Sequence, residues 1–418
     1  MSGVMNKILA IAVLAFTISF ASFSQKKDLN YFLENAVNND PQFSEVQGLI
    51  LQNKIDSAII VAANRVQINA NGNAMYAPVI NGFGYDMAIT NGGQLSALVA
   101  LNKQINNRPN LRLQFRSLQL QTDSIINSSA IYKQDVKKAI VIQYIAAYGT
   151  QLQLEVSDQI IALLSGEEKI LKILTQQNVY KQTDYLAFLV VLQQQQLARN
   201  QLQLQFKNDY ATLNYLAGLK DTSAEKLEDP QLQVIRNFQP YNSPFFFTFR
   251  LDSLRISNER NIIKVQYRPR VNLFADAGYQ SSLVTTPYRN FGYSFGINLS
   301  VPIYDGHQKK LQLSKFDIDE RMRMHRFDFF KTQFEQQIQQ LQQQLQGVES
   351  LSTSINTQLE YLETLIKVDR NLLQTGDIKI ADFVLALNNY ITAKNLLAQN
   401  QIARYQVVQQ LNYWNMKL

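Results

Sequence analysis

The chain repeats itself with a shift of 198 residues. Leu299–Asp305 ends a stretch of alternating polarity and opens a long helical stretch, and Leu101–Asn107 does the same 198 residues earlier. Near the end of each half, Asp184 corresponds to Asp382 with the same shift. Because an internal repeat constrains the whole architecture, the sequence predicts one structural plan built twice.

Changes of composition and periodicity divide the chain into four parts. Lys7, the apolar run Ile8–Phe20 and the small residues after it are typical of a secretory signal peptide, and this run is too short to span a bilayer. A stretch with Pro230, Pro240 and mixed charge separates the halves. The predicted parts are a signal peptide at 1–24, a first repeat at 25–217, a linker at 218–243 and a second repeat at 244–418.

The composition argues against an enzyme, a metalloprotein and a nucleic-acid-binding protein. The sequence has no Cys, and its two histidines, His307 and His325, have no third ligand or triad partner at useful spacing. The net charge of +7 comes from Lys and Arg that are scattered among acids and Gln, so we interpret it as ordinary surface charge. Gly-containing segments such as Asn91–Gly93 lack the Lys-Ser/Thr of a phosphate loop. We therefore predict no catalytic, cofactor-binding or metal-binding residue.

Each repeat contains a pattern typical of a β-hairpin. In the second repeat, at about 269–304, apolar and polar residues alternate over Val271–Leu283 and Phe291–Ile303. In the first, at about 73–106, we expect a strand over Met75–Ile89, a turn at Asn91–Gly93 and a returning strand. Strands of this length suit a membrane barrel, although a soluble amphipathic hairpin is an alternative. The residues expected to face lipid are Phe291, Tyr293, Phe295, Ile297 and Leu299.

Long helical hairpins are predicted after the β-hairpins, at about 108–217 and 306–416. Asp305 is placed to cap a helix that runs from about His307 to Leu373. Its apolar residues step by 4 and 3, a heptad spacing that predicts coiled-coil packing, with Ser352 and Asp369 as polar interruptions. Sharp turns are predicted at 177–183 and 374–381. The seam residues are Phe334, Ile338, Leu341, Leu345, Val348, Ile355, Leu359, Leu362, Ile366 and Leu373.

Two β-hairpins give four strands, and single-chain membrane barrels begin at about eight. Copies of the chain must therefore complete any barrel. Three copies would supply 12 strands, and four long helices per chain would supply 12 helices. The predicted fold combines all-α coiled coil with a transmembrane β-barrel: a trimeric, 12-stranded barrel continued by a 12-helix periplasmic tunnel.

Three segments together resemble the TolC-like outer membrane efflux proteins. They are Arg268-Pro269, the junction Leu299–Gly306 and the turn Gly376–Ala386. The resemblance covers nearly the whole mature chain. It implies a homotrimeric passive duct in the outer membrane of a Gram-negative bacterium, with a large periplasmic part, in contact with outer-membrane lipid. Its implied partners are a periplasmic adaptor (membrane fusion) protein and an inner-membrane RND or ABC transporter, as in tripartite efflux or type I secretion.

The resemblance also implies roles for the two turns. The periplasmic tip or gate would include Thr183, Asp184, Asp382 and Leu385, where Leu385 replaces the second aspartate that the family carries. A simpler interpretation is that Asp184 and Asp382 cap the returning helices. The turns have diverged, which suggests inequivalent grooves for the adaptor. The residues expected to dock it are Asn178, Val179, Tyr180, Gly376, Asp377 and Ile378.

Two further functions compete with the duct. A secreted or envelope structural coiled-coil protein without channel activity would also explain the Gln-rich heptads, but the paired β-hairpins argue against it. A periplasmic hydrolase is a weaker hypothesis, because no nucleophile stands at credible spacing from a His and an acid. A wide, water-filled lumen selects weakly, so the sequence does not predict the cargo.

Overall fold

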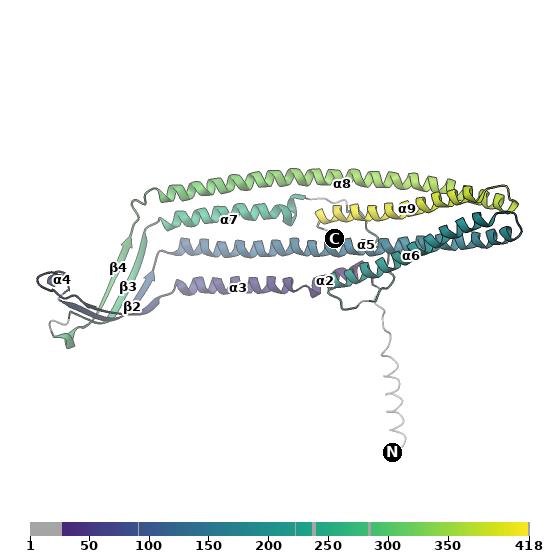
Figure 1. The fold of residues 1–418 in the computed structure, drawn as a ribbon. Coiled ribbons are helices and arrows are strands. Elements are labelled where there is room, and N and C mark those ends of the chain that lie inside the picture. Colours follow the sequence, from purple (N-terminus) through teal and green to yellow (C-terminus); the bar gives the residue numbers. More distant parts are fainter. Residues whose placement is uncertain (1–26, 91, 222, 236–239, 283–285, 417–418) are drawn as a thin grey trace, which may run out of the picture. The chain divides into compact units, whose positions relative to one another are not determined.

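The computed structural model describes residues 27–90, 92–221, 223–235, 240–282 and 286–416 (Figure 1). The predicted signal peptide at 1–24 lies outside these residues. The chain forms two compact units. The sheet unit comprises 41–132 and 239–337, and the helical unit comprises 1–40, 133–238 and 338–418, each within the described residues. Each unit draws on both halves of the sequence, so the predicted repeat boundaries remain a prediction.

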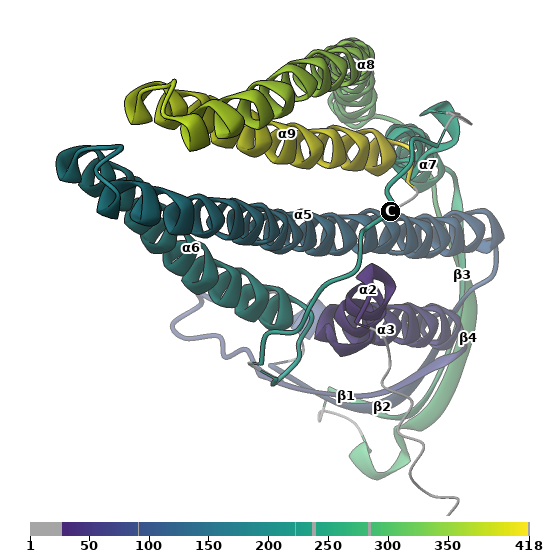
Figure 2. The same cartoon turned by 90° about the vertical axis from the view of Figure 1, so that its right-hand side faces the viewer.

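The sheet unit contains one four-stranded antiparallel sheet with the order β1-β2-β3-β4 (Figure 2). Its strands are β1 (Gln67–Tyr76), β2 (Gly93–Gln104), β3 (Arg270–Ser281) and β4 (Phe291–Ser300). At one end of the sheet, which we call the base, every strand joins a helix. These helices are α3 (Pro41–Ala63), α5 (Arg108–Gln176), α7 (Pro244–Gln266) and α8 (Gln308–Thr375). Three short elements are α4 (Met87–Thr90), η1 (Pro240–Asn242) and η2 (Pro287–Arg289).

The second β-hairpin forms where its alternation predicts it, but the first strand of the first hairpin was placed wrongly. The predicted strand over Met75–Ile89 is largely a connection that contains α4, and the real strand is β1. In β1, asparagines at 69, 71 and 73 alternate with Ala or Gly at 70, 72 and 74. The period of two is therefore present, but without the large apolar side chains that made the later segment look like a strand.

The helical unit is built on helices α2 (Leu29–Asn39), α6 (Gln182–Leu216) and α9 (Ile380–Trp414), with the later parts of α5 and α8. Phe32 of α2 is fully buried, 5.8 Å from the ring of Tyr144 and 6.1 Å from that of Tyr210. The predicted linker packs on this core, because Leu227 is buried and the Tyr144 hydroxyl donates to the Glu228 carbonyl. Its described residues up to 235 are thus part of the helical unit, whereas 240–243 belong to the sheet unit.

The heptad seam of α8 is confirmed. Seven of its ten predicted residues are buried, and near its middle Leu341 packs with Val407 and Leu411 of α9. Asn400 of α9 donates a hydrogen bond of 2.9 Å to the carbonyl oxygen of Val348. The α8 helix begins as predicted, with the Lys309 amide donating to the Asp305 carboxylate. The seven buried seam residues are Phe334, Leu341, Ile355, Leu359, Leu362, Ile366 and Leu373.

Within the described parts of the chain, no helix has both the length and the apolar character needed to cross a membrane.

Candidate functional site

One face of the sheet is apolar across all four strands. Directly opposed residues of antiparallel strands point to the same side, so the register shows which residues share a face. Row by row, Ala70 lies opposite Val99, Val99 opposite Ala277, and Ala277 opposite Tyr293. Lys103, at the base, is the only charged residue on this face of the described strands.

The five residues predicted to face lipid all lie on this apolar face. They occupy alternate positions of β4 and are 62 to 81% exposed in the chain. An apolar face this exposed marks a surface that another phase or molecule covers. These residues are Phe291, Tyr293, Phe295, Ile297 and Leu299.

The opposite face of the sheet carries amides, hydroxyls and small residues. Asp276 accepts a hydrogen bond of 2.7 Å from the Ser294 hydroxyl on this face. Phe274, which interrupts the alternation of its strand, lies against Gly296, where an added Cβ would come within 2.7 Å of the ring. The glycine thus makes room for the ring on this mainly polar face, which also holds Met75 and Leu98. Its asparagines are Asn69, Asn71, Asn73, Asn102, Asn272 and Asn298.

The two turns of the helical unit share one backbone geometry. Asn178 and Gly376 both have positive φ, at 60° and 79°. In the first turn the Val179 amide donates to the Leu174 carbonyl, and in the second the Asp377 amide donates to the Leu372 carbonyl, both at 2.9 Å. This is the Schellman ending of a helix. The two turns therefore differ in their side chains, as predicted from the sequence, but have equivalent backbones.

Asp184 and Asp382 do not cap the returning helices. The N-cap residues are Lys181 and Lys379, and neither makes a side-chain capping hydrogen bond. Each aspartate lies three residues further on, in the first helical turn. There a carboxylate is favoured by the positive end of the helix dipole. The capping explanation is thus wrong, and the acidic residues have an electrostatic role in their helices instead.

The two turns contact each other through Tyr180. Its hydroxyl lies 3.0 Å from the Leu373 carbonyl oxygen and 2.9 Å from that of Ile378, and its single proton is shared between these two acceptors. Burial, followed by the charge of Asp377, raises the pKa of Tyr180. Val179 packs close to Gly376, because a Cβ on that glycine would lie 3.1 Å from Cγ1 of the valine. The tip residues of both helical hairpins thus form one structure.

The remaining predicted tip residues differ in exposure. Leu385, which takes the place of the expected second aspartate, is 61% exposed. Thr183 is exposed, whereas Asp184 is partly buried. The structure therefore brings the predicted turn residues together, while the functional role of each stays a prediction.

Buried charges near this end of the helices were not predicted as functional. Glu167 of α5 is 1% exposed and accepts a hydrogen bond of 2.6 Å from Nε of Arg370 in α8. Asp369, only 7% exposed, has its pKa raised by burial and then by the charge of Asp382. The sequence signal for Asp369 was its position as a polar interruption in the heptad seam. For Glu167 no such signal exists.

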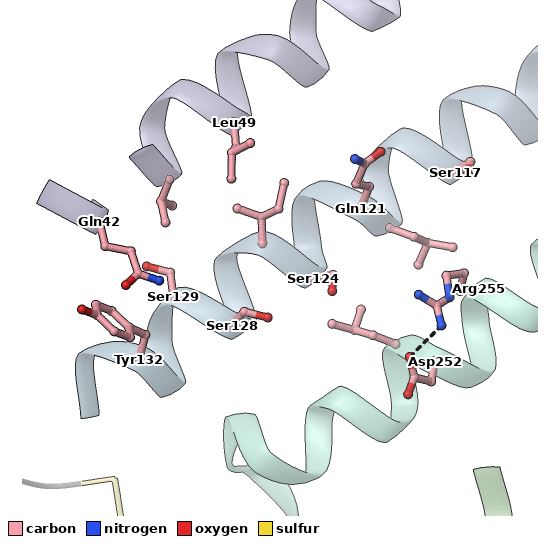
Figure 3. Close-up of a pocket in the computed structure, with 14 residues that line it drawn as sticks. Gln42, Leu49, Ser117, Gln121, Ser124, Ser128, Ser129, Tyr132, Asp252 and Arg255 are labelled. Atoms are coloured by element: carbon pink, nitrogen blue, oxygen red, sulfur yellow. Dashed lines mark ion pairs between the residues drawn. The ribbon is translucent and has the colours of Figure 1, made fainter. Parts of the chain in front are cut away.

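A pocket of about 490 Å³ lies in the sheet unit between α3, α5 and α7 (Figure 3). Its α5 wall presents hydroxyls, and Arg255 pairs with Asp252 of the same helix at 3.3 Å. The described lining residues include no histidine or cysteine, and the carboxylate of Asp252 is already paired with an arginine. This lining does not match a catalytic site. The hydroxyls belong to Ser117, Ser124, Ser128, Ser129 and Tyr132.

No group of three or more His, Cys, Asp or Glu residues that could hold a metal ion occurs among the described residues.

The sequence matches no protein-family model and no curated protein. Among solved structures, it is similar to the outer membrane protein VceC of Vibrio cholerae, with a TM-score of 0.75 and 13% identity, covering 93% of this chain and 96% of that one. CusC, described in connection with transmembrane channel formation, has a TM-score of 0.75 and 12% identity, covering 94% and 92%. The CmeC outer membrane channel of Campylobacter jejuni has a TM-score of 0.70 and 11% identity, covering 93% and 86%.

These similarities extend over nearly the whole chain. The protein thus has the TolC-like fold of outer membrane channels, with long coiled-coil helices and four antiparallel strands per chain. This is the fold that the sequence resemblance implied.

Proposed function

We propose that this protein is the outer-membrane exit duct of a tripartite efflux or type I secretion system. It acts as a passive trimeric channel and performs no reaction. The observation that carries the proposal is the two-faced sheet, in which an exposed apolar face lies opposite a face of amides and small residues. Such alternation suits a barrel wall with lipid outside and water inside.

The dimensions of the strands agree with a membrane crossing. The strands have 10 to 12 residues. At about 3.3 Å per residue and a tilt of about 40°, ten residues span about 25 Å, which is the height of the apolar band of membrane barrels. Exposed aromatic residues occur beyond both ends, at Tyr85 and Tyr288 in the connections and at Tyr304 beside the base. Aromatic residues of this kind are typical of the two membrane interfaces.

Trimerisation closes the barrel. The edges of the four-stranded sheet are β1 and β4, and strand edges in a membrane must be paired. Three chains give 12 strands, and their helices continue the wall into the periplasm as a tunnel. The solved channels of this fold support this assembly.

The two turns form the periplasmic tip in this proposal. Thr183, Asp184, Asp382 and Leu385 line its entrance, where carboxylates repeated by threefold symmetry make the potential negative at the level of the tip. The adaptor docks on the paired turns, which have equivalent backbones but different side chains, and an inner-membrane RND or ABC transporter supplies the energy. The docking residues are Asn178, Val179, Tyr180, Gly376, Asp377 and Ile378.

The structural coiled-coil alternative gives no role to the exposed apolar face. A water-soluble rod that left such a face uncovered would associate through it. The five exposed residues of β4 therefore favour the duct over the rod.

Detergent extraction tests the proposal. We expect the full chain, expressed with export, to be released from membranes only by detergent and to run as a heat-resistant trimer. Release of an extended monomer or rod by salt or by freeze–thaw without detergent would contradict it.

Gentle solubilisation tests the partners. The adaptor and the pump should copurify with the wild-type trimer. A Val179→Asp variant, which puts a charge at the contact of the two turns, should lose the adaptor, while a Leu254→Asp variant in α7 should keep it. Equal recovery of the adaptor with both variants would contradict docking at the turns.

A further inference from the structure

The net charge of the chain is concentrated at the base of the sheet. The four connections between helices and strands, taken as 63–67, 103–108, 264–270 and 300–310, contain eight Lys and Arg residues and one acid, Asp305. The whole sequence has 40 Lys and Arg and 33 Asp and Glu. Outside the four connections, it therefore has 32 basic and 32 acidic residues. These four connections therefore carry a net charge equal to that of the whole chain. The eight residues are Arg65, Lys103, Arg108, Lys264, Arg268, Arg270, Lys309 and Lys310.

Five of these cations line two adjoining hollows at the base, which share Gln104. Arg108, Arg268 and Arg270 line the first, of about 730 Å³. Arg65 and Lys103 line the second, of about 490 Å³. The other polar side chains in both are amides, and the described lining residues include no carboxylate.

The hollows lie toward the polar face of the sheet. The second is lined by Asn102, Asn272 and Asn298, which the register places together on that face. Arg270, which lines the first hollow, lies two residues before Asn272 in β3 and therefore shares its face of the sheet. With the apolar face against lipid, as in the proposed function, both hollows face the lumen of the duct.

Within the described part of the chain, the hydrogen bonds that these side chains donate go to neutral carbonyl groups. Among the described residues, none of the five forms an ion pair. Lys103 donates to the Asn64 carbonyl oxygen, and Arg270 donates to that of Gln266 at 3.0 Å. Guanidinium and ammonium groups are hydrogen-bond donors only, and arginine matches phosphate and carboxylate groups in geometry. The base thus has the chemistry of an anion receptor.

We propose that this cationic base makes the duct favour anionic cargo, meaning solutes with phosphate, carboxylate or sulfonate groups. The inference rests on the proposed function and adds a substrate class to it. Clefts lined by charge of one sign raise the local concentration of ions of the other sign. Lys103 has its strand position on the apolar face, so four of the five lining cations remain for the lumen, and threefold symmetry would place twelve of them around one level of it.

Reversal potentials test this inference. Purified wild-type trimers in a planar bilayer, under a KCl gradient, should prefer chloride to potassium. A triple variant, Arg65→Gln, Arg108→Gln and Arg270→Gln, should lower the chloride-to-potassium permeability ratio by about twofold or more. The control triple variant removes the same charge from exposed arginines of α7 and α8, with Arg250→Gln, Arg321→Gln and Arg326→Gln, and should change this ratio less.

The outcomes separate the inference from the proposed function. Wild-type channels that conduct but prefer potassium overturn the inference, as does an equal change in both triple variants, and the duct itself stands in both cases. Wild-type trimers without conductance overturn the proposed function. If the triple variant does not form trimers, the single variants replace it, and the inference then requires each to lower the ratio.

Discussion

At the scale of single residues, the contact between the two helical turns depends on Tyr180. Its hydroxyl is the donor to the carbonyl oxygens of Leu373 and Ile378. A Tyr180→Phe substitution keeps the ring and leaves these carbonyls with one donor fewer. We expect a loss of about 1 kcal/mol, the net value of one such hydrogen bond, seen as faster amide exchange in the 376–383 segment.

The matched control is Tyr361→Phe, because Tyr361 is exposed on α8. It should leave amide exchange unchanged. Faster exchange with both variants, or with neither, would contradict the role given to Tyr180.

The pH dependence of the same contact has a definite sign. Burial, and then Asp377, raises the pKa of Tyr180, so the folded state favours the neutral hydroxyl. The stability that it contributes is complete below the ordinary tyrosine pKa of about 10 and decreases as pH rises through the folded-state value. Amide exchange in the turns should therefore increase above about pH 10 in the wild type, and by less in Tyr180→Phe. The same increase in both would contradict this linkage.

At the scale of elements, the two turns allow a matched comparison of left-handed positions. Gly376→Ala places a Cβ at φ 79° and 3.1 Å from Val179, and should cost about 1–2 kcal/mol. Gly376→Asn should cost less, because asparagine tolerates this conformation, as Asn178 does at φ 60°. Thermal unfolding in detergent measures both. A midpoint as low for Gly376→Asn as for Gly376→Ala would show that contact with Val179, and not φ, sets the cost.

The two faces of the sheet can be compared at adjacent positions of a central strand. Val99 lies on the apolar face of β2 and Ala100 on the polar face. Val99→Arg should lower the yield of membrane-inserted trimer sharply, since a cation at the middle of the lipid face costs about 2–4 kcal/mol. Ala100→Arg should insert, because it lies opposite Asp276. Similar yields of the two variants would mean that this face does not meet lipid.

The elements that the sequence predicts well are those with a strong period. The heptads of α8, apart from Ser352 and Asp369, and the alternation of β3 and β4 place apolar residues at the expected positions, so burial and register follow from them. For β1 the pattern consists of Asn, Ala and Gly, which carry little propensity for strands. Its pairing with β2 depends on long-range contact. The positions of Tyr180 and Glu167 likewise depend on another helix that lies more than 190 residues away in sequence, so local sequence gives no signal for these contacts.

At the scale of the whole molecule, the duplication makes each half contribute one β-hairpin and one helical hairpin. The register of β2 against β3 joins the two halves into one sheet and aligns their apolar faces. The base of that sheet then brings together cations that are far apart in the sequence. Each half supplies only part of either face and only part of the cationic base, so the complete surfaces form when β2 pairs with β3.

Single-channel recording shows whether the protein is a passive trimeric duct. Purified wild-type trimers added to a planar bilayer should produce stepwise conductance without nucleotide or partner proteins. Trimers of the Ala100→Arg variant should conduct as well. Folded wild-type trimers that insert into the bilayer but give no conductance steps would contradict a passive duct.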